Sequence, residues 1–354
     1  MRVLQIVADG NPGGRTTHVL QILRGFRSTH SMGLITQSRS YLFHQAEGLD
    51  IPSYGLHFFR SRLNLAVSFH LNKIYSEWKP DLIHVHGGRA GLFHTITGTT
   101  VPTVYTVHGF HFLHKPSGIR WLATFAERVI ISRANRIIFV SEHDAKIARA
   151  CKILPDNKPT SVIHNGIQLR KVPEDHTTPA KHVGFVGRLE YPKDPFLFLD
   201  ALELLPDYTA TMVGGGSLES AVKQEITHRD LAKRVRQVGS LSHQESLKIL
   251  STFDVLLLTS RWEGLPLVVL EAMWAGVPVV AVNVSGLSEI IEDKKNGLLI
   301  DERSGQALAW AVRAAVENHE LRTEMINQAR QHVRNRFSEE NMFSEIQKIY
   351  AAMA

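Results

Sequence analysis

The sequence predicts an α/β protein with two doubly wound parallel sheets, each of the Rossmann type. The 354 residues exceed what a single hydrophobic core usually supports, so two domains are expected. Short apolar runs rich in β-branched residues alternate with helix-length amphipathic segments, and this rhythm restarts halfway along the chain. Continuous apolar strands separated by helices indicate parallel sheets that are covered on both faces.

Two sets of six strands are expected, each strand bounded by Gly, Pro, Asn or Asp. The first set comprises residues 3–7, 33–36, 82–86, 103–108, 136–140 and 161–164, with helices over 15–26, 63–78, 119–133 and 142–150. The second set comprises residues 182–186, 209–213, 235–238, 255–259, 277–282 and 297–300. The turn signal Asn165-Gly166 and the polar residues 170–181 indicate a linker between the sets, and Ser338 is a plausible N-cap of a final helix.

The composition excludes several classes of protein. An apolar content of 44% with 21% charged residues is ordinary for a soluble globular protein, and no apolar stretch approaches the length of a membrane span. The first residues, with Asp9 among them, indicate a strand and not a signal peptide. Cys151 is the only cysteine, fits a reducing compartment and is expected to be a small buried residue. We therefore expect a cytoplasmic protein, free or peripheral on the inner face of the cell membrane.

The net charge of +6 is unevenly distributed. Residues 1–165 contain 19 Lys and Arg against 9 Asp and Glu, whereas residues 166–354 contain 21 against 25. The basic half would suit anionic lipid, a lipid diphosphate or nucleic acid, and a solvated basic surface explains it equally well. Aromatic and basic residues interleave over 56–62 and 111–121, which is typical of a membrane interface, and no nucleic-acid recognition motif accompanies them.

The sharpest chemical signal is RWEGLPLVVLE, residues 261–271, which directly follows a predicted strand. Pro266 suits the first turn of a helix, so Glu263 is expected in the loop before the helix and Glu271 within it. A helix N-terminus favours a phosphate, and a carboxylate can accept hydrogen bonds from sugar hydroxyls. The structural alternative is that Glu263 caps the helix and Glu271 is solvated.

A second signal lies in VGFVGRLEYPK, residues 183–193, where Arg188 and Lys193 follow a buried strand. Two cations at this position can neutralise a diphosphate as it leaves. Parallel sheets bind ligands outside the carboxyl ends of their strands, so both segments are expected at one sheet edge. Two facing sheets would place the reaction in the cleft between the domains.

The segments GFVGRLEYPKDP, TMVGGGSLE, VRQVGSL and STFDVLLLTSRWEGLPLVVLEAMWAGVPVVAVNVSGLSEII resemble, in this order, the donor domain of glycosyltransferase family 4, which has the GT-B fold. The family's hallmark is two glutamates separated by seven residues, and Glu263 and Glu271 match it. The resemblance implies two Rossmann-like domains across a cleft and a C-terminal helix that crosses back to the first. The expected domains are residues 1–165 plus 338–354, on the acceptor side, and residues 166–337, which bind the donor.

The resemblance also implies the roles of individual residues. Glu263 would bind hydroxyls of the donor hexose, and Glu271 would bind the ribose. Arg188 and Lys193 would hold the diphosphate in place of a metal, so that no metal and no other cofactor is required. Main-chain groups around Gly264, Leu265 and Leu267 would contact phosphate or sugar, and the base would lie against the loop that contains Val238.

In the first half, Gly13 and Gly14 lie between a strand and a helix and would let the backbone approach a phosphate or sugar closely. No G-x-G-x-x-G motif is present, so a nicotinamide cofactor is not indicated. The resemblance implies that this loop closes over the donor and that His108 faces the transferred sugar as a catalytic contact. His84 and His86 share one strand face, but no Cys, Asp or Glu lies at ligand spacing, so no metal site is predicted.

The function that the resemblance implies is retaining transfer of a hexose or N-acetylhexosamine from a nucleotide diphosphate sugar, with UDP favoured over GDP. The acceptor would be a saccharide linked to polyprenyl diphosphate in the assembly of a capsule, O-antigen or exopolysaccharide, at an anionic membrane surface and without nucleic acid. One alternative is a catalytically silent, membrane-associated protein that binds sugar nucleotides. Another is a nucleotide-sugar epimerase or phosphorylase on the same fold, and the spacing of Glu263 and Glu271 argues against the epimerase.

Overall fold

The computed structural model describes residues 1–60, 64–114, 116–170 and 181–353. The chain divides into two compact units, Met1–Gly166 with Glu339–Ala354, and Ile167–Ser338. Most of the predicted linker (171–180) and parts of the two aromatic and basic stretches (61, 62 and 115) lie outside the described residues. Each unit contains one parallel sheet with helices on both faces, which confirms the predicted fold class of two Rossmann-like domains.

Unit 1 is built on a seven-stranded sheet with the order β3-β2-β1-β4-β5-β6-β7, in which every pairing is parallel. Its strands are β1 (Arg2–Val7), β2 (Ser31–Gln37), β3 (Ser53–Leu56), β4 (Leu82–His86), β5 (Thr103–Val107), β6 (Arg136–Phe139) and β7 (Thr160–Val162). β3 was not predicted; it is a four-residue edge strand in which no residue is fully buried. A strand at an edge needs no continuous apolar run, so its signal is weak.

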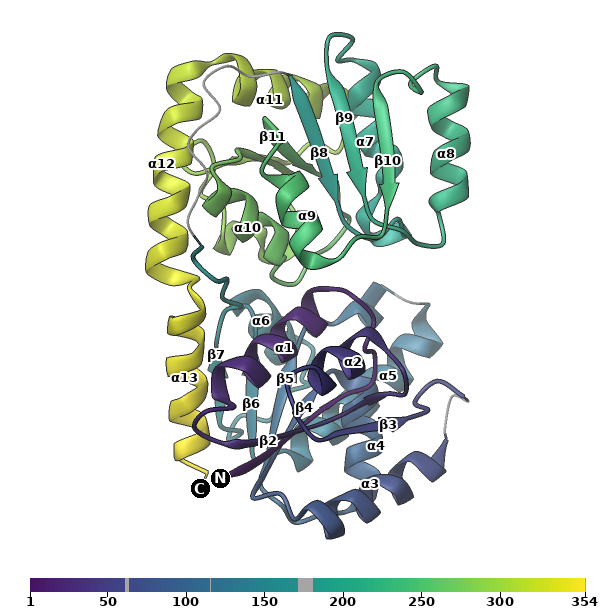
Figure 1. The fold of residues 1–354 in the computed structure, drawn as a ribbon, viewed down its shortest axis with the longest axis vertical. Helices are drawn as coiled ribbons and strands as arrows, with labels where there is room; N and C mark the ends of the chain where they lie inside the picture. The colour runs from purple at the N-terminus through teal and green to yellow at the C-terminus, as the bar shows by residue number, and fades with distance from the viewer. Residues whose placement is uncertain (61–63, 115, 171–180, 354) are drawn as a thin grey trace. The chain divides into compact units, whose positions relative to one another are not determined.

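Helices cover both faces of this sheet (Figure 1). One hydrophobic cluster joins the sheet to α1 (Gly14–Phe26), α2 (Tyr41–Glu47) and α13 (Glu339–Ala351), and the other to α3 (Leu65–Trp78), α4 (Gly88–Thr97), α5 (Ser117–Arg133) and α6 (Glu142–Ala150). The short helix η1 spans His111–His114. Met342, Ile346, Ile349 and Tyr350 of α13 are buried in the first cluster. The last helix of the chain is therefore part of the core of unit 1.

Unit 2 is built on a six-stranded parallel sheet with the order β10-β9-β8-β11-β12-β13. Its strands are β8 (His182–Val186), β9 (Thr209–Val213), β10 (Val235–Gly239), β11 (Val255–Leu258), β12 (Val279–Val282) and β13 (Leu298–Ile300). One face packs against α7 (Pro195–Glu203), α8 (Glu219–His228) and α11 (Gly305–Glu317). The other contacts α9 (His243–Leu250) and α10 (Leu267–Ala275), and α12 (His319–Arg336) packs on α10. Two short helices, η2 (Tyr191–Lys193) and η3 (Ser285–Glu289), complete the unit.

Three local expectations were wrong. Asn165-Gly166 forms no turn: the segment leads from β7 to the bridge between Ile167 and Ser338, and the Gly166 carbonyl accepts a hydrogen bond from Gln21. Pro266 lies at the N-cap of α10, one position before the first helical turn. Cys151 is exposed, because it follows the last residue of α6 at the surface.

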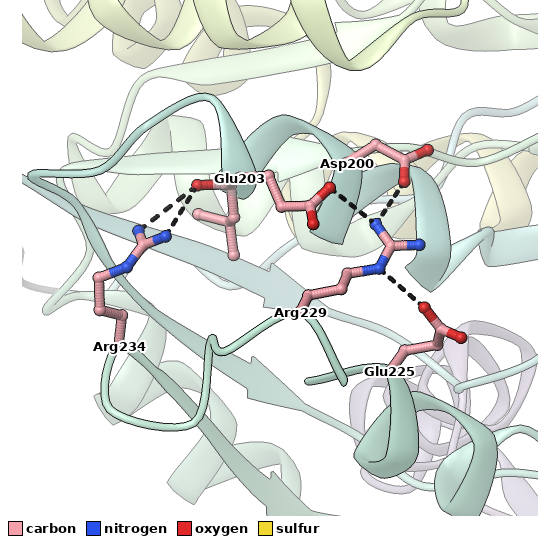
Figure 2. Close-up of polar contacts among 6 residues, drawn as sticks. Asp200, Glu203, Glu225, Arg229 and Arg234 are labelled. Carbon is pink, nitrogen blue, oxygen red and sulfur yellow. Dashed lines mark hydrogen bonds and ion pairs between the residues drawn. The ribbon is translucent and has the colours of Figure 1, made fainter. Parts of the chain in front are cut away.

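Arg229, the residue that follows α8, links α8 to α7 through ion pairs (Figure 2). Its Nη1 lies 2.6 Å from Asp200 Oδ1 and 3.3 Å from Glu203 Oε2, and its Nε lies 2.8 Å from Glu225 Oε2. We expect Arg229→Met to lower the free energy of unfolding by about 1 kcal/mol at low salt, because three half-exposed carboxylates lose their shared cation. Urea titrations at low and at high salt check this, since screening should shrink the loss. Lys223→Met, at an exposed position of α8, is the control. A similar loss of stability in this variant would contradict the stabilising role of the Arg229 ion pairs.

Candidate functional site

The topology of each sheet marks one place where a ligand site is expected. β1 lies between β2 and β4 in unit 1, and β8 lies between β9 and β11 in unit 2, so the strand order reverses beside these strands. Open parallel sheets bind ligands outside the carboxyl ends of the strands at such a reversal. The loops after β8 and β11 contain Arg188, Lys193 and Glu263, so the residues predicted from sequence lie at this point of unit 2.

Lys193 and Glu263 form an ion pair although they lie 70 positions apart in the chain. Lys193 Nζ donates to Glu263 Oε1, and Ser260 Oγ donates to the same oxygen. The Glu263 side chain is only 9% exposed and that of Lys193 21%, so solvent screens this pair less than it screens a surface pair. The site thus holds an ionised carboxylate and an ammonium group beside each other at the entrance of α10.

Asp194, which was not among the predicted site residues, holds together the two loops that carry this pair. The residue is buried, its carboxylate lies 2.7 Å from Arg261 Nη2, and it also accepts a hydrogen bond from Arg303. Thr259 Oγ1 donates to the main-chain carbonyls of Lys193 and Asp194, at 3.0 and 2.9 Å. An Asp directly before Pro195, at a helix start, was the available signal.

Arg188 and Lys193 form ion pairs with different carboxylates. The Arg188 side chain is 61% exposed, and its Nη1 lies 3.2 Å from Glu190 Oε2. The loop that carries it is pressed against the glycine run that follows β9: a Cβ added to Gly214 would lie 2.0 Å from the carbonyl oxygen of Gly187. Glycine is therefore required at position 214 by close backbone approach. The main chain around Arg188 is held in place while its side chain extends into solvent.

Glu271 has a partner that sequence reasoning missed. His243 Nε2 lies 2.7 Å from Glu271 Oε1, and the two side chains are 38% and 13% exposed. His243 is the first residue of α9, which begins with a capping box formed by Ser242 and Glu245. That capping-box pattern after β10 could have placed His243 at the carboxyl edge of the sheet. The carboxylate of Glu271 is thus oriented from a neighbouring helix.

The remaining predicted contacts of unit 2 surround the start of α10. Leu265 and Leu267 are 5% and 6% exposed, so only their main chain is placed to meet a ligand. Gly264 and Val238 are half-buried, and Val238 lies near the end of β10. Glu263, Gly264 and Leu265 precede Leu267, the first residue of α10, where helix N–H groups and the positive end of the helix dipole favour an anion.

In unit 1, Gly13 and Gly14 lie at the start of α1, with Gly13 as its N-cap. A Cβ added to either glycine would meet no atom within 4 Å, so packing inside unit 1 does not require glycine at these positions. His108 follows β5 and is half-buried. The structure places these predicted residues after β1 and β5, on the same carboxyl edge of the sheet.

The half-buried His108 lies against a group of buried imidazoles. Its Nε2 lies 3.2 Å from His86 Nδ1, and the rings of His84 and His86 lie on one strand face, 4.2 Å apart. His18, from α1, completes a set with His86 and His108 whose ligand atoms all lie within 4.8 Å of one another. Burial lowers the pKa of His18 to about 4 and also lowers the pKa of His86, so both rings are neutral. The spacing of His84 and His86 along one strand does not reveal this grouping, because His18 and His108 come from other segments.

Two family models match successive parts of the chain. Residues 12–171 match the one described as Glycosyltransferase Family 4, and residues 169–332 match the one described as Glycosyl transferases group 1. Among the described residues, none of the helices combines the length and the apolar character of a membrane span.

Two proteins with similar sequences are named as glycosyltransferases. The chain is 30% identical over 258 residues to an Escherichia coli UDP-Gal:alpha-D-GlcNAc-diphosphoundecaprenol alpha-1,3-galactosyltransferase, a match that spans 65% of each protein. It is 26% identical to the E. coli O-antigen biosynthesis glycosyltransferase WbnH, over 84% of this chain and 85% of that protein. Among solved structures, Anabaena Alr3699/HepE in complex with UDP-glucose has a TM-score of 0.85 at 22% identity, covering 99% of this chain and 100% of that one.

Proposed function

Because the chain belongs to glycosyltransferase family 4, we propose that it is a retaining, metal-independent glycosyltransferase of surface polysaccharide synthesis. It transfers a hexose or an N-acetylhexosamine from a UDP-sugar to a hydroxyl of a lipid-linked saccharide. The observation that carries this proposal is the pairing of Glu263 with Lys193 beside the start of α10. A carboxylate and a cation at a helix N-terminus suit the sugar and the diphosphate of one donor.

In the proposed donor complex, Lys193 binds both Glu263, which contacts the sugar, and the diphosphate. Its ammonium has three N–H donors, so it can keep the bond to Glu263 and donate to a phosphate oxygen at the same time. Glu263 then accepts hydrogen bonds from hydroxyls of the hexose with its second oxygen. Arg188, which is exposed and lies in the same loop after β8, adds a second cation to the diphosphate. As the glycosidic bond breaks, these cations and the N–H groups of α10 stabilise the charge that develops on the leaving diphosphate.

Glu271 binds the ribose in this proposal, and His243 positions its carboxylate. The base lies against the end of β10 near Val238 and is contacted by main chain. UDP is favoured because the galactosyltransferase relative is named for UDP-Gal and the Anabaena structures contain UDP or UDP-glucose. In unit 1, His108 contacts the transferred sugar, and the loop with Gly13 and Gly14, where an added Cβ would meet no atom within 4 Å, approaches the donor.

The acceptor is proposed to be lipid-linked because α5 presents apolar side chains to solvent. Trp121, Leu122 and Phe125 are 67%, 61% and 56% exposed, and the rings of Trp121 and Phe125 are stacked. Arg120 and Arg128 on the same helix are also exposed. Exposed aromatic residues beside cations suit the interface of an anionic membrane. The galactosyltransferase relative is named for an acceptor on diphosphoundecaprenol, which supports this assignment.

Removing the aromatic side chains of α5 should weaken membrane binding. We expect Trp121→Gln/Phe125→Gln to bind phosphatidylglycerol vesicles about tenfold or more weakly, because each ring that enters the interface contributes about 1–2 kcal/mol. Vesicle co-sedimentation measures this. Trp310→Gln is the matched control, since Trp310 is 66% exposed on α11 of unit 2 and should not alter binding. Equal binding of the double variant and the wild type would contradict the assignment of α5.

The test of the proposed function is nucleotide release from a panel of UDP-, GDP- and ADP-sugars with EDTA present, with and without lipid extract. Release from a UDP-sugar that lipid extract stimulates, with the sugar recovered on the lipid, supports transfer without a metal. Tight UDP binding without release from any donor would favour a silent binding protein. Conversion of the donor into an epimer without release would favour an epimerase.

A further inference from the structure

His18 lies in unit 1 with ring nitrogens that the fold leaves poorly satisfied. The residue is 1% exposed, and among the described residues neither of its ring nitrogens makes a hydrogen bond of normal geometry, although the Asn165 amide is nearby. A buried polar group without a well-formed hydrogen bond is uncommon in native proteins, and an ion is one explanation for it. The rings nearest to His18 are those of His86 and His108, whose centroids lie 5.7 and 5.0 Å from its own.

The distances within this histidine triad suit a metal ion. Zn²⁺ binds imidazole nitrogen at about 2.0–2.1 Å, so two nitrogens of a tetrahedral site lie about 3.3–3.4 Å apart. His86 Nδ1 and His108 Nε2 are 3.2 Å apart, which matches that separation. All ligand atoms of the triad lie within 4.8 Å of one another, so a nitrogen of His18 must approach by roughly 1.5 Å or less. Rotation of one side chain supplies such a movement.

A second layer of contacts orients His86 as a ligand. Its Nε2 lies 2.8 Å from Gln5 Oε1, and Gln5 Nε2 donates to the hydroxyl of Tyr350 at 3.1 Å. Because Gln5 Oε1 accepts a hydrogen bond from His86 Nε2–H, His86 Nδ1 carries the lone pair that faces His108. Metal-bound histidines typically donate their other ring N–H to such a partner. Gln5 and Tyr350 are fully buried, so this orientation is held by the core of unit 1.

We propose that His18, His86 and His108 bind one divalent transition-metal ion, for which Zn²⁺, Co²⁺ and Ni²⁺ are suited by their affinity for imidazole. Three histidines leave the fourth position of a tetrahedral ion open for hydroxide. The negative charge of the hydroxide offsets the charge of the ion. It thereby also reduces the repulsion between the ion and Arg15, which lies near His86. The ion is an inhibitor and not a cofactor, because it occupies His108. The inhibition rests on the proposed function, whereas the binding does not.

Titration of the full-length protein with Co²⁺ tests the binding. We expect one equivalent to give the visible absorption of four-coordinate Co²⁺ and Zn²⁺ to displace it. His18→Gln should lose at least tenfold in affinity. His44→Gln is the matched control, because His44 and Glu47 form an exposed pair that could hold stray metal, and it should bind like the wild type. If His18→Gln does not fold, His108→Gln, at a half-buried position, replaces it. No such absorption in the wild type, or equal binding by the folded triad variant, would overturn the site.

Enzyme assays then test the inhibition separately. We expect Zn²⁺ to suppress transfer, EDTA to restore it, and the His18→Gln variant not to respond to Zn²⁺. Binding without inhibition would leave the metal site intact and overturn the inhibitory role at His108. If no donor supports transfer at all, the proposed function fails, while the Co²⁺ absorption still reports on the site.

Discussion

Replacement of Glu263 by glutamine is expected to lower kcat/KM for the UDP-sugar by about 10²–10³-fold. The amide keeps the size of the side chain. It loses the negative charge that pairs with Lys193 and that strengthens the hydrogen bonds accepted from hydroxyls of the hexose. The affinity for UDP itself should change little, because UDP lacks the sugar that Glu263 is proposed to bind. Initial rates of nucleotide release give kcat/KM, and calorimetry gives the affinity for UDP.

The matched control for this variant is Glu317→Gln. Glu317 forms an ion pair with Lys181 at 2.9 Å in the same unit, at the amino end of β8 and away from the proposed donor site. This variant should retain full activity. Unchanged turnover in a folded Glu263→Gln protein would show that Glu263 is not part of the donor site. A large loss of UDP affinity would show that Glu263 contacts the nucleotide instead of the sugar.

The sheets could be predicted closely from sequence because their strands are buried on both faces. β4, β8 and β9 were predicted at their observed bounds, since a parallel strand covered by helices appears as a continuous apolar run. β3 could not be predicted in the same way, because an edge strand with half-buried residues lacks that run. Asn165-Gly166 shows the limit of local signals: its main chain bonds to Gln21 and Met342, partners that no turn rule can anticipate.

The candidate site could be predicted in part. Residues whose position depends on the local sequence pattern were predicted, and partners that come from distant segments were not. Glu263, Glu271 and Lys193 lie in segments whose local pattern places them after strands or on a helix, so sequence alone placed them at one sheet edge. Their partners depend on tertiary structure. His243 of α9 pairs with Glu271 of the neighbouring helix α10. Asp194 pairs with Arg261 and Arg303, which lie in other loops. Local spacing contains no information about such pairs.

The histidine triad illustrates the same limit for metal sites. Sequence spacing identifies ligands that share a helix, a strand or a short loop, as His84 and His86 share a strand. The triad instead combines a helix, a strand end and the residue after a neighbouring strand. Parallel pairing of β4 with β5 brings His86 and His108 together, and the helix after β1 adds His18. The order of strands in the sheet was needed to find it.

Lys193→Met is expected to reduce kcat/KM by about 10²–10³-fold as well, because the leaving diphosphate loses its cation and Glu263 loses its partner. If the two residues act as one unit, Lys193→Met/Glu263→Gln should lose little more than the worse single variant. Independent contributions would instead multiply the two losses, to about 10⁴–10⁶-fold. The matched cycle with Lys181→Met and Glu317→Gln should leave activity unchanged in all its variants. Multiplicative losses at Lys193 and Glu263 would show that the ion pair exists only before the donor binds, with each side chain then contacting a separate part of the sugar nucleotide.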